Sequence, residues 1–319
     1  MTRGLALAAA ALLAACAPAA RDLKPALGPD DAGTVWFASA GSLVRTADFT
    51  YAPGEPVVLS GDLALPAGAG PFPAVVLAHG CGGVGNAETG WAPVLRQAGY
   101  ATFLVDSFEG RGLREVCTQG RALVGLQRVP DAYGALGILA THPRIAAGRV
   151  ALMGFSHGGI LTLAASTEWA RRTYAPPGRP AFRAFLAFYP SCNVTSPEHA
   201  RISAPLRIHA GERDDWTPAA PCRELVAALR ASGQDAEIVV YRGARHSFDN
   251  VGRRLASLGN VDSVARCRLR TASILGPLLD PDALRACMTK GATVGWSPAA
   301  TAAARRNVLA QLAVLLGPR

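Results

Sequence analysis

Continuous apolar runs alternate with amphipathic stretches along most of this chain. Residues 73–78 are apolar throughout, as is typical of a central parallel strand that is buried on both faces. In the last amphipathic stretch, 298–316, Val308 and four leucines share one face, and two arginines lie on the opposite face. The alternation predicts an α/β fold with a mostly parallel central sheet and helices on both faces. The further strands are expected at 101–105, 150–153, 184–188, 206–210 and 237–241, and the further helices at 91–98, 131–140 and 222–231.

Two segments depart from this alternation. Residues 45–65 predict an antiparallel hairpin that opens the domain, with strand cores at 57–59 and 63–65. Residues 250–297, which precede the last helix, have no clear periodicity, and we expect an insertion there that could form a lid. The sequence has no internal repeat, so residues 34–319 are interpreted as one domain.

The first residues have the features of an export signal. Arg3 precedes an apolar run over 5–15 that is too short to span a bilayer. The run ends in Leu-Ala-Ala followed by Cys16, which resembles the lipobox of bacterial lipoproteins, where the chain is cleaved before the cysteine and the thiol carries a lipid. We therefore predict a signal peptide over 1–15 and a lipid on Cys16. The Ala/Pro/Gly/Asp-rich composition predicts a flexible tether over 16–33.

The residue after the cysteine bears on the compartment. Ala17, and not an aspartate, follows Cys16, which favours an anchor in the bacterial outer membrane, facing the periplasm or the cell surface. An ordinary secretory signal, giving a soluble periplasmic or secreted protein, is the alternative.

Charge and cysteine content narrow the function classes. The formal net charge is +9, yet only Lys24 and Lys290 are lysines. The arginines do not gather into a basic run interleaved with aromatic residues, so we do not expect nucleic-acid binding. Apart from Cys16 there are six cysteines, which in an exported protein predict disulfides with about 15 possible connectivities. No CxxC motif or Cys/His cluster has zinc spacing, and we expect neither a metal nor another cofactor.

A glycine-framed serine is the strongest chemical signal. Ser156 is the centre of Gly154-Phe-Ser-His-Gly158, a G-x-S-x-G pattern. An apolar strand pattern precedes the pentapeptide and a helical pattern follows it, as the nucleophile elbow of an α/β-hydrolase requires. We predict that Ser156 is a nucleophile; a serine in a tight strand–helix turn without chemistry is the plain alternative.

A serine nucleophile needs a base, and the base needs an orienting acid, which in this fold follow in the order serine, acid, histidine. Among three acids in the turn 211–218, Asp214 is three residues after the glycine and four before the proline, as in comparable α/β-hydrolase turns. Asp215 is the nearest rival and is otherwise expected to cap a helix or to lie at the surface. His246 is the only histidine after these acids and follows a strand, so it is the predicted base.

The tetrahedral intermediate of such a reaction needs two preorganised donors for its oxyanion. The N–H of His157 directly follows the nucleophile and is the first candidate. The second is the N–H of Cys81, in the turn His79-Gly-Cys-Gly-Gly83 after the strand that ends at residue 78. Glycines in a flexible loop without function are the alternative interpretation of that turn.

These motifs together resemble the dienelactone hydrolase family. The resemblance rests on the turn 79–83, on Asp106-Ser-Phe with Arg111-Gly, on the elbow around Ser156, on 211–218 and on the His-Ser-Phe at 246–248, in this order from about residue 46 to the C-terminus. The resemblance implies a hydrolase that needs no cofactor and acts on a small-molecule ester or lactone. The namesake enzymes of the family use a cysteine nucleophile, whereas this chain has a serine, which points to general carboxylesterase chemistry.

One loop raises a question of substrate binding. Arg111 lies in the loop 106–111 at the carboxyl end of a strand, where it could bind a substrate carboxylate with two hydrogen bonds. An ion pair with Asp106 is the structural alternative. Since this loop and Cys117 should pass near the turn 79–83, we predict a Cys81–Cys117 disulfide.

The remaining cysteines are paired by the same topological reasoning. Cys192 and Cys222 follow neighbouring strand ends around the acid turn, and Cys267 with Cys287 would close a loop within the insertion.

The function predicted from the sequence is that of a lipid-anchored serine esterase that works through an acyl-enzyme on Ser156. A hydrolase of small peptides and a catalytically idle lipoprotein that binds small ligands are the alternatives. The sequence predicts no oligomeric state.

Overall fold

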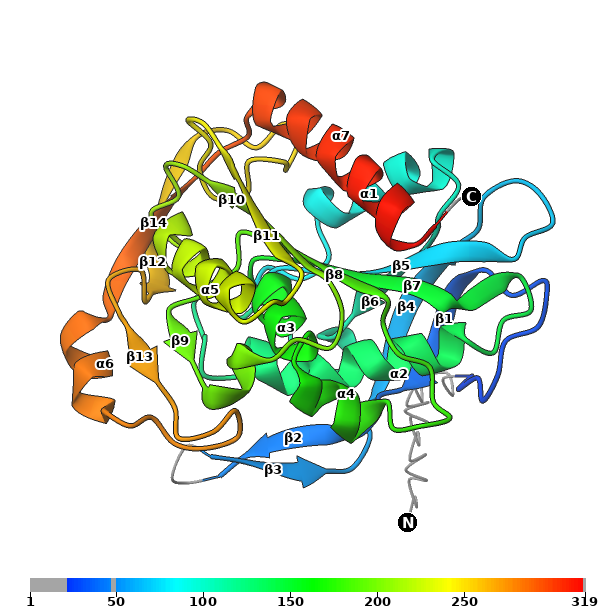
Figure 1. Ribbon diagram of the computed structural model, residues 1–319, viewed down its shortest axis with the longest axis horizontal. Coiled ribbons are helices and arrows are strands. Elements are labelled where there is room, and N and C mark those ends of the chain that lie inside the picture. Colours follow the sequence, from blue (N-terminus) through cyan, green and yellow to red (C-terminus); the bar gives the residue numbers. More distant parts are fainter. Residues whose placement is uncertain (1–21, 47–49, 318–319) are drawn as a thin grey trace, which may run out of the picture.

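An eight-stranded sheet crosses the molecule in the computed structural model, which describes residues 22–46 and 50–317 (Figure 1). The strand order is β1-β4-β6-β5-β7-β8-β10-β11; all neighbours from β6 to β11 run parallel, and β4 pairs antiparallel with both β1 and β6. This confirms the predicted mostly parallel sheet. The strands are β1 Gly33–Ala38, β4 Val58–Ala64, β5 Phe72–Ala78, β6 Ala101–Asp106, β7 Ile145–Phe155, β8 Ala184–Phe188, β10 Leu206–Gly211 and β11 Ala236–Tyr241.

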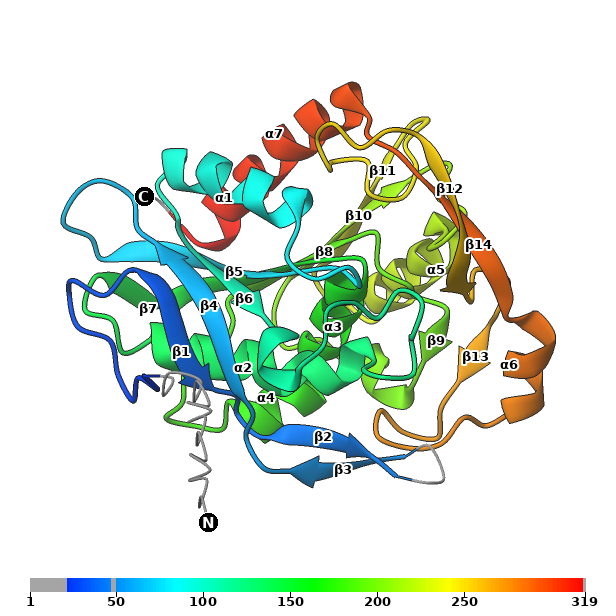
Figure 2. The ribbon, with the colours of Figure 1, turned by 180° about the vertical axis from the view of Figure 1, so that it is seen from behind.

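Helices cover both faces of the sheet and enclose two separate cores. One face carries α1 (Asn86–Gln97) and α7 (Pro298–Leu315), and the other carries α2 (Val129–Leu139), α3 (His157–Ala165), α4 (Glu168–Tyr174) and α5 (Ala219–Ala231) (Figures 1 and 2). Strand β5 is apolar at every position because it contributes side chains to both cores. Val76 faces the α2 and α3 side, whereas Val75 and Leu77 face α1 and α7, and all three are fully buried.

The predicted opening hairpin over 45–65 is wrong. Residues 58–64 form the single strand β4, and the hairpin is made instead by β2 (Ser42–Arg45) and β3 (Tyr51–Gly54). Gly61, in the middle of β4, makes no turn: a Cβ on it would collide with the ring of Phe103 on the neighbouring strand. The glycine therefore serves close packing between strands, and the strand continues through it.

Part of the predicted tether belongs to the domain. Within residues 22–33, Leu27 is buried in the core, its N–H donates to Thr141 Oγ1 at 2.8 Å, and the N–H of Lys24 donates to Trp36 O at 2.9 Å. One buried leucine and these hydrogen bonds hold the segment against β1 and the end of α2, so composition alone misassigned it. The predicted signal peptide and Cys16 lie outside the described residues.

The region 250–297 forms a small substructure at one end of the sheet (Figure 2). It contains the antiparallel pair β12 (Ala256–Ser263) and β14 (Thr289–Val294), the short strand β13 (Leu269–Arg270), which pairs with β9 (Val194–Thr195), and the helix α6 (Pro281–Cys287). The Cys267–Cys287 disulfide closes it. All three predicted disulfides are confirmed, the other two being Cys81–Cys117 and Cys192–Cys222.

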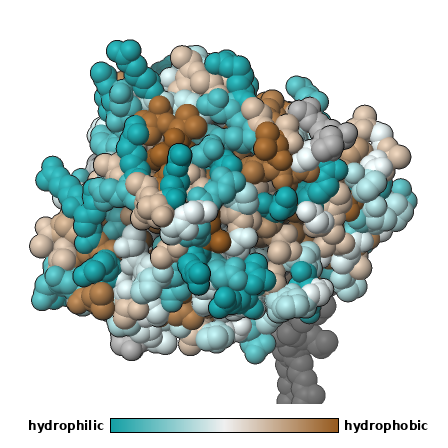
Figure 3. Space-filling view, viewed as in Figure 1, coloured by the Kyte–Doolittle hydropathy of each residue, from teal (hydrophilic) through white to brown (hydrophobic). Residues whose placement is uncertain are grey.

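Surface hydrophobicity is scattered on the face that Figure 3 shows. Hydrophobic residues there form small groups separated by hydrophilic ones. In the part of the chain that the structure describes, no helix has the length and apolar character needed to cross a bilayer.

Candidate active site

Ser156 occupies a sharp turn between β7 and α3. Its backbone has φ 53° and ψ −109°, a region that residues with a side chain rarely adopt, and its N–H donates to Phe188 O at 2.9 Å. A Cβ on Gly154 would collide with the carbonyl oxygen of Gly158, and one on Gly158 with that of Ala78. Only glycine fits at these two positions. Because neither glycine has a side chain, the turn can be tight enough to place the serine hydroxyl above the sheet.

Ser156, His246 and Asp214 form a continuous hydrogen-bonded row. His246 Nε2 lies 2.9 Å from Ser156 Oγ, and His246 Nδ1 lies 2.9 Å from Asp214 Oδ2. The side chains of His246 and Asp214 are 1% and 0% exposed. With Nδ1–H directed at the carboxylate, Nε2 is the unprotonated nitrogen that faces the serine hydroxyl, which is the arrangement a general base requires.

Asp214 is held by the turn in which it lies. Its Oδ1 accepts the backbone N–H groups of Trp216 at 2.9 Å and Thr217 at 2.8 Å, and its Oδ2 accepts the Thr217 hydroxyl at 2.9 Å. The rival Asp215 lies toward the insertion, where its Oδ1 accepts the N–H of Thr293 at 2.7 Å. The structure therefore brings Asp214, and not Asp215, to the histidine.

Three residues around the histidine were missed by sequence reasoning. Thr217 Oγ1 lies 3.0 Å from His246 Nδ1, and the rings of Tyr189 and Trp216 have centroids 4.7 and 4.8 Å from that of His246. Trp216 and Thr217 are in the acid turn that the sequence singled out, but nothing in the pattern marked Tyr189. The two rings pack against the imidazole, which is buried.

The glycine-rich turn after β5 lies beside the serine. A Cβ on Gly80 would stand 3.7 Å from Ser156 Cβ. The next residue, Cys81, is anchored by its disulfide to Cys117 and by its carbonyl, which accepts the N–H of Val116 at 2.8 Å. Within the described residues, neither the N–H of Cys81 nor that of His157 has a hydrogen-bond partner. Both predicted oxyanion donors therefore have unused hydrogens: His157 directly follows the nucleophile, and Cys81 directly follows Gly80, which packs beside it.

Buried charged groups lie behind this turn. Glu88 accepts the N–H of Gly80 at 3.2 Å and that of Gly85 at 3.0 Å, and burial raises its pKa to about 7. Arg128, which is fully buried, donates to His79 O at 2.8 Å and contacts the His157 ring. Glu88 is three residues after the N-cap Gly85, the position from which a glutamate can accept the N-cap N–H, and this spacing could have marked the acid; no sequence signal identified Arg128.

Arg111 does not form the ion pair with Asp106 that was the structural alternative to substrate binding. Its guanidinium makes two hydrogen bonds of 2.8 Å to the buried Asp131 and one of 2.7 Å to Ser107 O. The Asp106 carboxylate instead accepts backbone N–H groups of its own loop, those of Phe108 and Glu109. Asp131, at the start of α2, outcompetes Asp106 because it presents both oxygens to the planar guanidinium.

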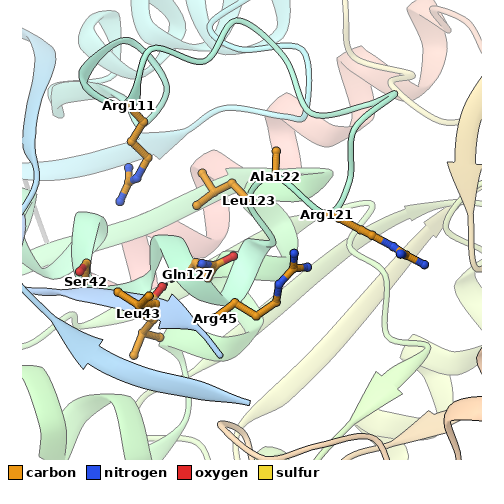
Figure 4. A pocket seen from close by; sticks show the side chains of 9 residues that line it. Ser42, Leu43, Arg45, Arg111, Arg121, Ala122, Leu123 and Gln127 are labelled. Carbon is orange, nitrogen blue, oxygen red and sulfur yellow. Dashed lines mark hydrogen bonds between the residues drawn. The ribbon is translucent and has the colours of Figure 1, made fainter. Parts of the chain in front are cut away.

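Arg111 also borders a hollow of about 350 Å³ between its loop, β2 and the segment before α2. Figure 4 shows the guanidinium extending toward this space, which Arg45, Arg121, Leu123 and Gln127 also line. The carbonyl of Leu123 lies 3.0 Å from His157 Nε2, so the hollow adjoins the residue that follows the nucleophile.

Among residues 22–46 and 50–317, no three His, Cys, Asp or Glu side chains are grouped so that they could hold a metal ion.

Known proteins resemble this chain in sequence and in fold. Residues 59–275, about two thirds of the chain, match the family model of the dienelactone hydrolase family. A curated relative from Bradyrhizobium, named a probable 2-oxo-3-(5-oxofuran-2-ylidene)propanoate lactonase, is 24% identical over 202 residues, which cover 58% of this chain and 77% of the relative.

Solved structures share the fold. A dienelactone hydrolase-like promiscuous phosphotriesterase from metagenomic libraries has a TM-score of 0.58 at 16% identity, covering 89% of this chain and 99% of that one. Thermogutta terrifontis esterase 2, in a form phosphorylated by paraoxon, has a TM-score of 0.50 at 21% identity, covering 62% and 82%.

Proposed function

This chain belongs to the dienelactone hydrolase family, and we propose that it is a serine hydrolase that cleaves small carboxylic esters, lactones among them, through an acyl-enzyme on Ser156. The observation that carries the proposal is the row Asp214–His246–Ser156, with 2.9 Å at each of its two contacts. The Bradyrhizobium lactonase and the Thermogutta esterase support this substrate class by their names.

The acylation step follows from the positions of these groups. Ser156 Oγ attacks the ester carbonyl carbon while its proton passes to His246 Nε2, and the buried Asp214 stabilises the imidazolium that results. The carbonyl oxygen becomes an oxyanion that accepts hydrogen bonds from the N–H groups of Cys81 and His157. His246 then protonates the leaving alkoxide, and the acyl group stays on the serine.

Deacylation uses the same groups in reverse. His246 Nε2 removes a proton from a water molecule, whose oxygen attacks the acyl carbon; a second oxyanion forms in the same place. When the tetrahedral adduct collapses, the histidine returns its proton to Ser156 Oγ and the carboxylic acid leaves.

The experiment is hydrolysis of p-nitrophenyl acetate by the purified protein and by Ser156→Ala, with Ser257→Ala as the matched control on the exposed strand β12. We expect the wild type and Ser257→Ala to be equally active and Ser156→Ala to lose at least about 10³-fold in kcat. Activity that survives in Ser156→Ala would refute the serine mechanism.

A fluorophosphonate probe separates the alternatives. Covalent labelling that Ser156→Ala abolishes is expected for an active serine, whereas folded wild-type protein that stays unlabelled would favour a ligand-binding protein. A substrate panel of esters, lactones and small peptides then distinguishes an esterase from a hydrolase of small peptides.

We also propose that the protein is exported and carries a lipid on Cys16. The lipobox-like sequence and the three disulfides support this, because disulfides persist in oxidising compartments. Fractionation after expression with labelled palmitate is the test: the wild type should be labelled and membrane-bound, and Cys16→Ser should be unlabelled. Unlabelled wild-type protein in the soluble fraction would contradict the anchor.

A further inference from the structure

A fully buried cation lies behind the two oxyanion donors. Arg128 is 0% exposed, and its Nη1 donates to His79 O at 2.8 Å and to His157 Nδ1 at 2.9 Å. The face of the Phe108 ring lies 5.4 Å from the guanidinium carbon. Within the described residues, Nε and Nη2 of this arginine have no hydrogen-bond partner.

This cation is poorly compensated for a buried charge. The nearby carboxylate of Asp131 is occupied by two hydrogen bonds from Arg111. Burial lowers the pKa of Arg128 to about 10, so the side chain still carries its charge at neutral pH. An apolar residue of similar volume is usually no worse for stability than an incompletely paired buried charge, which points to a role outside stability.

The contact of Arg128 with His157 Nδ1 determines which ring nitrogen of His157 carries the proton. Because a guanidinium can only donate, Nδ1 of His157 must accept, and the ring proton is then on Nε2, which donates to Leu123 O at 3.0 Å. The imidazole stays neutral, since burial and the adjacent positive charge lower its pKa to about 3. The ring is therefore held at both of its nitrogens, and it belongs to the residue whose N–H is the first predicted oxyanion donor.

The contact of Arg128 with His79 O helps to hold the turn that contains Cys81. The peptide between His79 and Gly80 is held at its oxygen by Arg128 and at its nitrogen by Glu88. The next carbonyl, Gly80 O, lies 2.7 Å from His79 Nδ1. That nitrogen carries the proton, because His79 Nε2 accepts the N–H of Ser107 at 3.1 Å. None of these contacts uses the Cys81 N–H, which has no hydrogen-bond partner within the described residues.

We infer that Arg128 is a positioning residue for the oxyanion hole. Through Nη1 alone, it holds both residues that supply the amide donors: His157 at its ring, and Cys81 by way of the carbonyl of His79. The inference rests on the proposed function. It assigns to the arginine a part in stabilising the transition state without contact with the substrate, so its loss should lower kcat and leave KM nearly unchanged.

The test compares Arg128→Met with the wild type on p-nitrophenyl acetate. We expect kcat to fall by about 100-fold, the lower end of the loss seen when an oxyanion donor is removed, with KM changed less than about threefold. Inhibition by a trifluoromethyl ketone is the second readout. Ser156 Oγ adds to its carbonyl carbon and passes its proton to His246, so the hemiketal presents an oxyanion to the two donors. Its Ki should rise in parallel with the loss in kcat.

Two variants separate positioning from stability. Arg207→Met removes another arginine, 8% exposed at the start of β10, which pairs with Asp235 and Glu237, and it should retain wild-type kcat and Ki. Arg128→Lys keeps one charge and three donors, and its kcat should lie between those of the wild type and Arg128→Met. Should Arg128→Met fail to fold, a tenfold or greater loss of kcat in folded Arg128→Lys carries the test.

The outcomes that overturn the inference are distinct from those that overturn the function. Wild-type kcat and Ki in folded Arg128→Met, or equal losses in Arg207→Met, refute the positioning role and leave the serine hydrolase intact. A wild type that hydrolyses no ester and binds no trifluoromethyl ketone refutes the proposed function, and this inference with it.

Discussion

The backbone at Ser156 makes a quantitative prediction about stability. Replacing the serine by alanine or by glycine removes the hydroxyl in both cases, so the two variants differ only in the Cβ. At φ 53° and ψ −109° a residue with a Cβ is outside the favoured regions, which costs of the order of 1–3 kcal/mol. Glycine relieves most of this strain, but its freer unfolded chain costs about 0.5–1 kcal/mol.

The difference of these two terms sets the expected result. Ser156→Gly should be more stable than Ser156→Ala by about 1 kcal/mol, and both should be inactive. Urea unfolding with the disulfides intact, followed by circular dichroism, measures the difference in the free energy of unfolding.

Ser166, at the end of α3, supplies the matched pair, because its φ of −72° and ψ of −15° are ordinary helical values. There the order should reverse, and Ser166→Gly should be less stable than Ser166→Ala by about 1 kcal/mol. If glycine is the less stable residue at position 156 as well, the serine turn stores no strain, and the reasoning is wrong.

Three further predictions concern charge, chemistry and packing. Burial raises the pKa of Glu88 from 4.5 to about 7, so from pH 4.5 to 7 the folded chain holds a proton that the unfolded chain has released, and stability falls as the pH rises. Over this window the wild type should lose about 3 kcal/mol that Glu88→Gln does not lose; parallel urea titrations at pH 4.5 and 7 whose difference stays constant would contradict this. Asp214→Asn should lower kcat by about 10³–10⁴-fold on p-nitrophenyl acetate, whereas Asp215→Asn should stay within about threefold of the wild type; equal losses would show that the wrong acid was assigned. Leu312→Ala, in the buried face of α7, should cost 2–5 kcal/mol in urea unfolding, and a loss below about 1 kcal/mol would mean that α7 contributes little to the core.

Local patterns in the chain were sufficient for much of the fold and of the site. The elbow around Ser156 could be identified because strand, turn and helix signals are adjacent in sequence. Asp214 and His246 then followed from chain order and from their places after strands. The disulfide pairing came from the same topology, because loops at one edge of a sheet must meet.

The missed features depend on contacts that are distant in sequence. The continuity of β4 through Gly61 depends on Phe103, and the packing of residues 22–33 depends on Leu27 reaching the core. Arg111 pairs with Asp131 because the fold brings the first turn of α2 to the loop after β6. Periodicity and short motifs do not predict such contacts between residues that are distant in sequence.

The region 250–297 leaves the domain and returns to it at almost the same point. The N–H of Trp296 donates to Arg253 O at 2.9 Å, and that of Gly295 to His246 O at 3.1 Å. Since the ends of this excursion already touch, its length can change without displacing the elements on either side. Residues of the excursion reach the acid turn, where Asp262 O accepts Trp216 Nε1–H at 2.9 Å. Exchange of this one continuous segment is therefore a route by which related chains could change the surroundings of Ser156, Asp214 and His246 while the positions of those three side chains are kept.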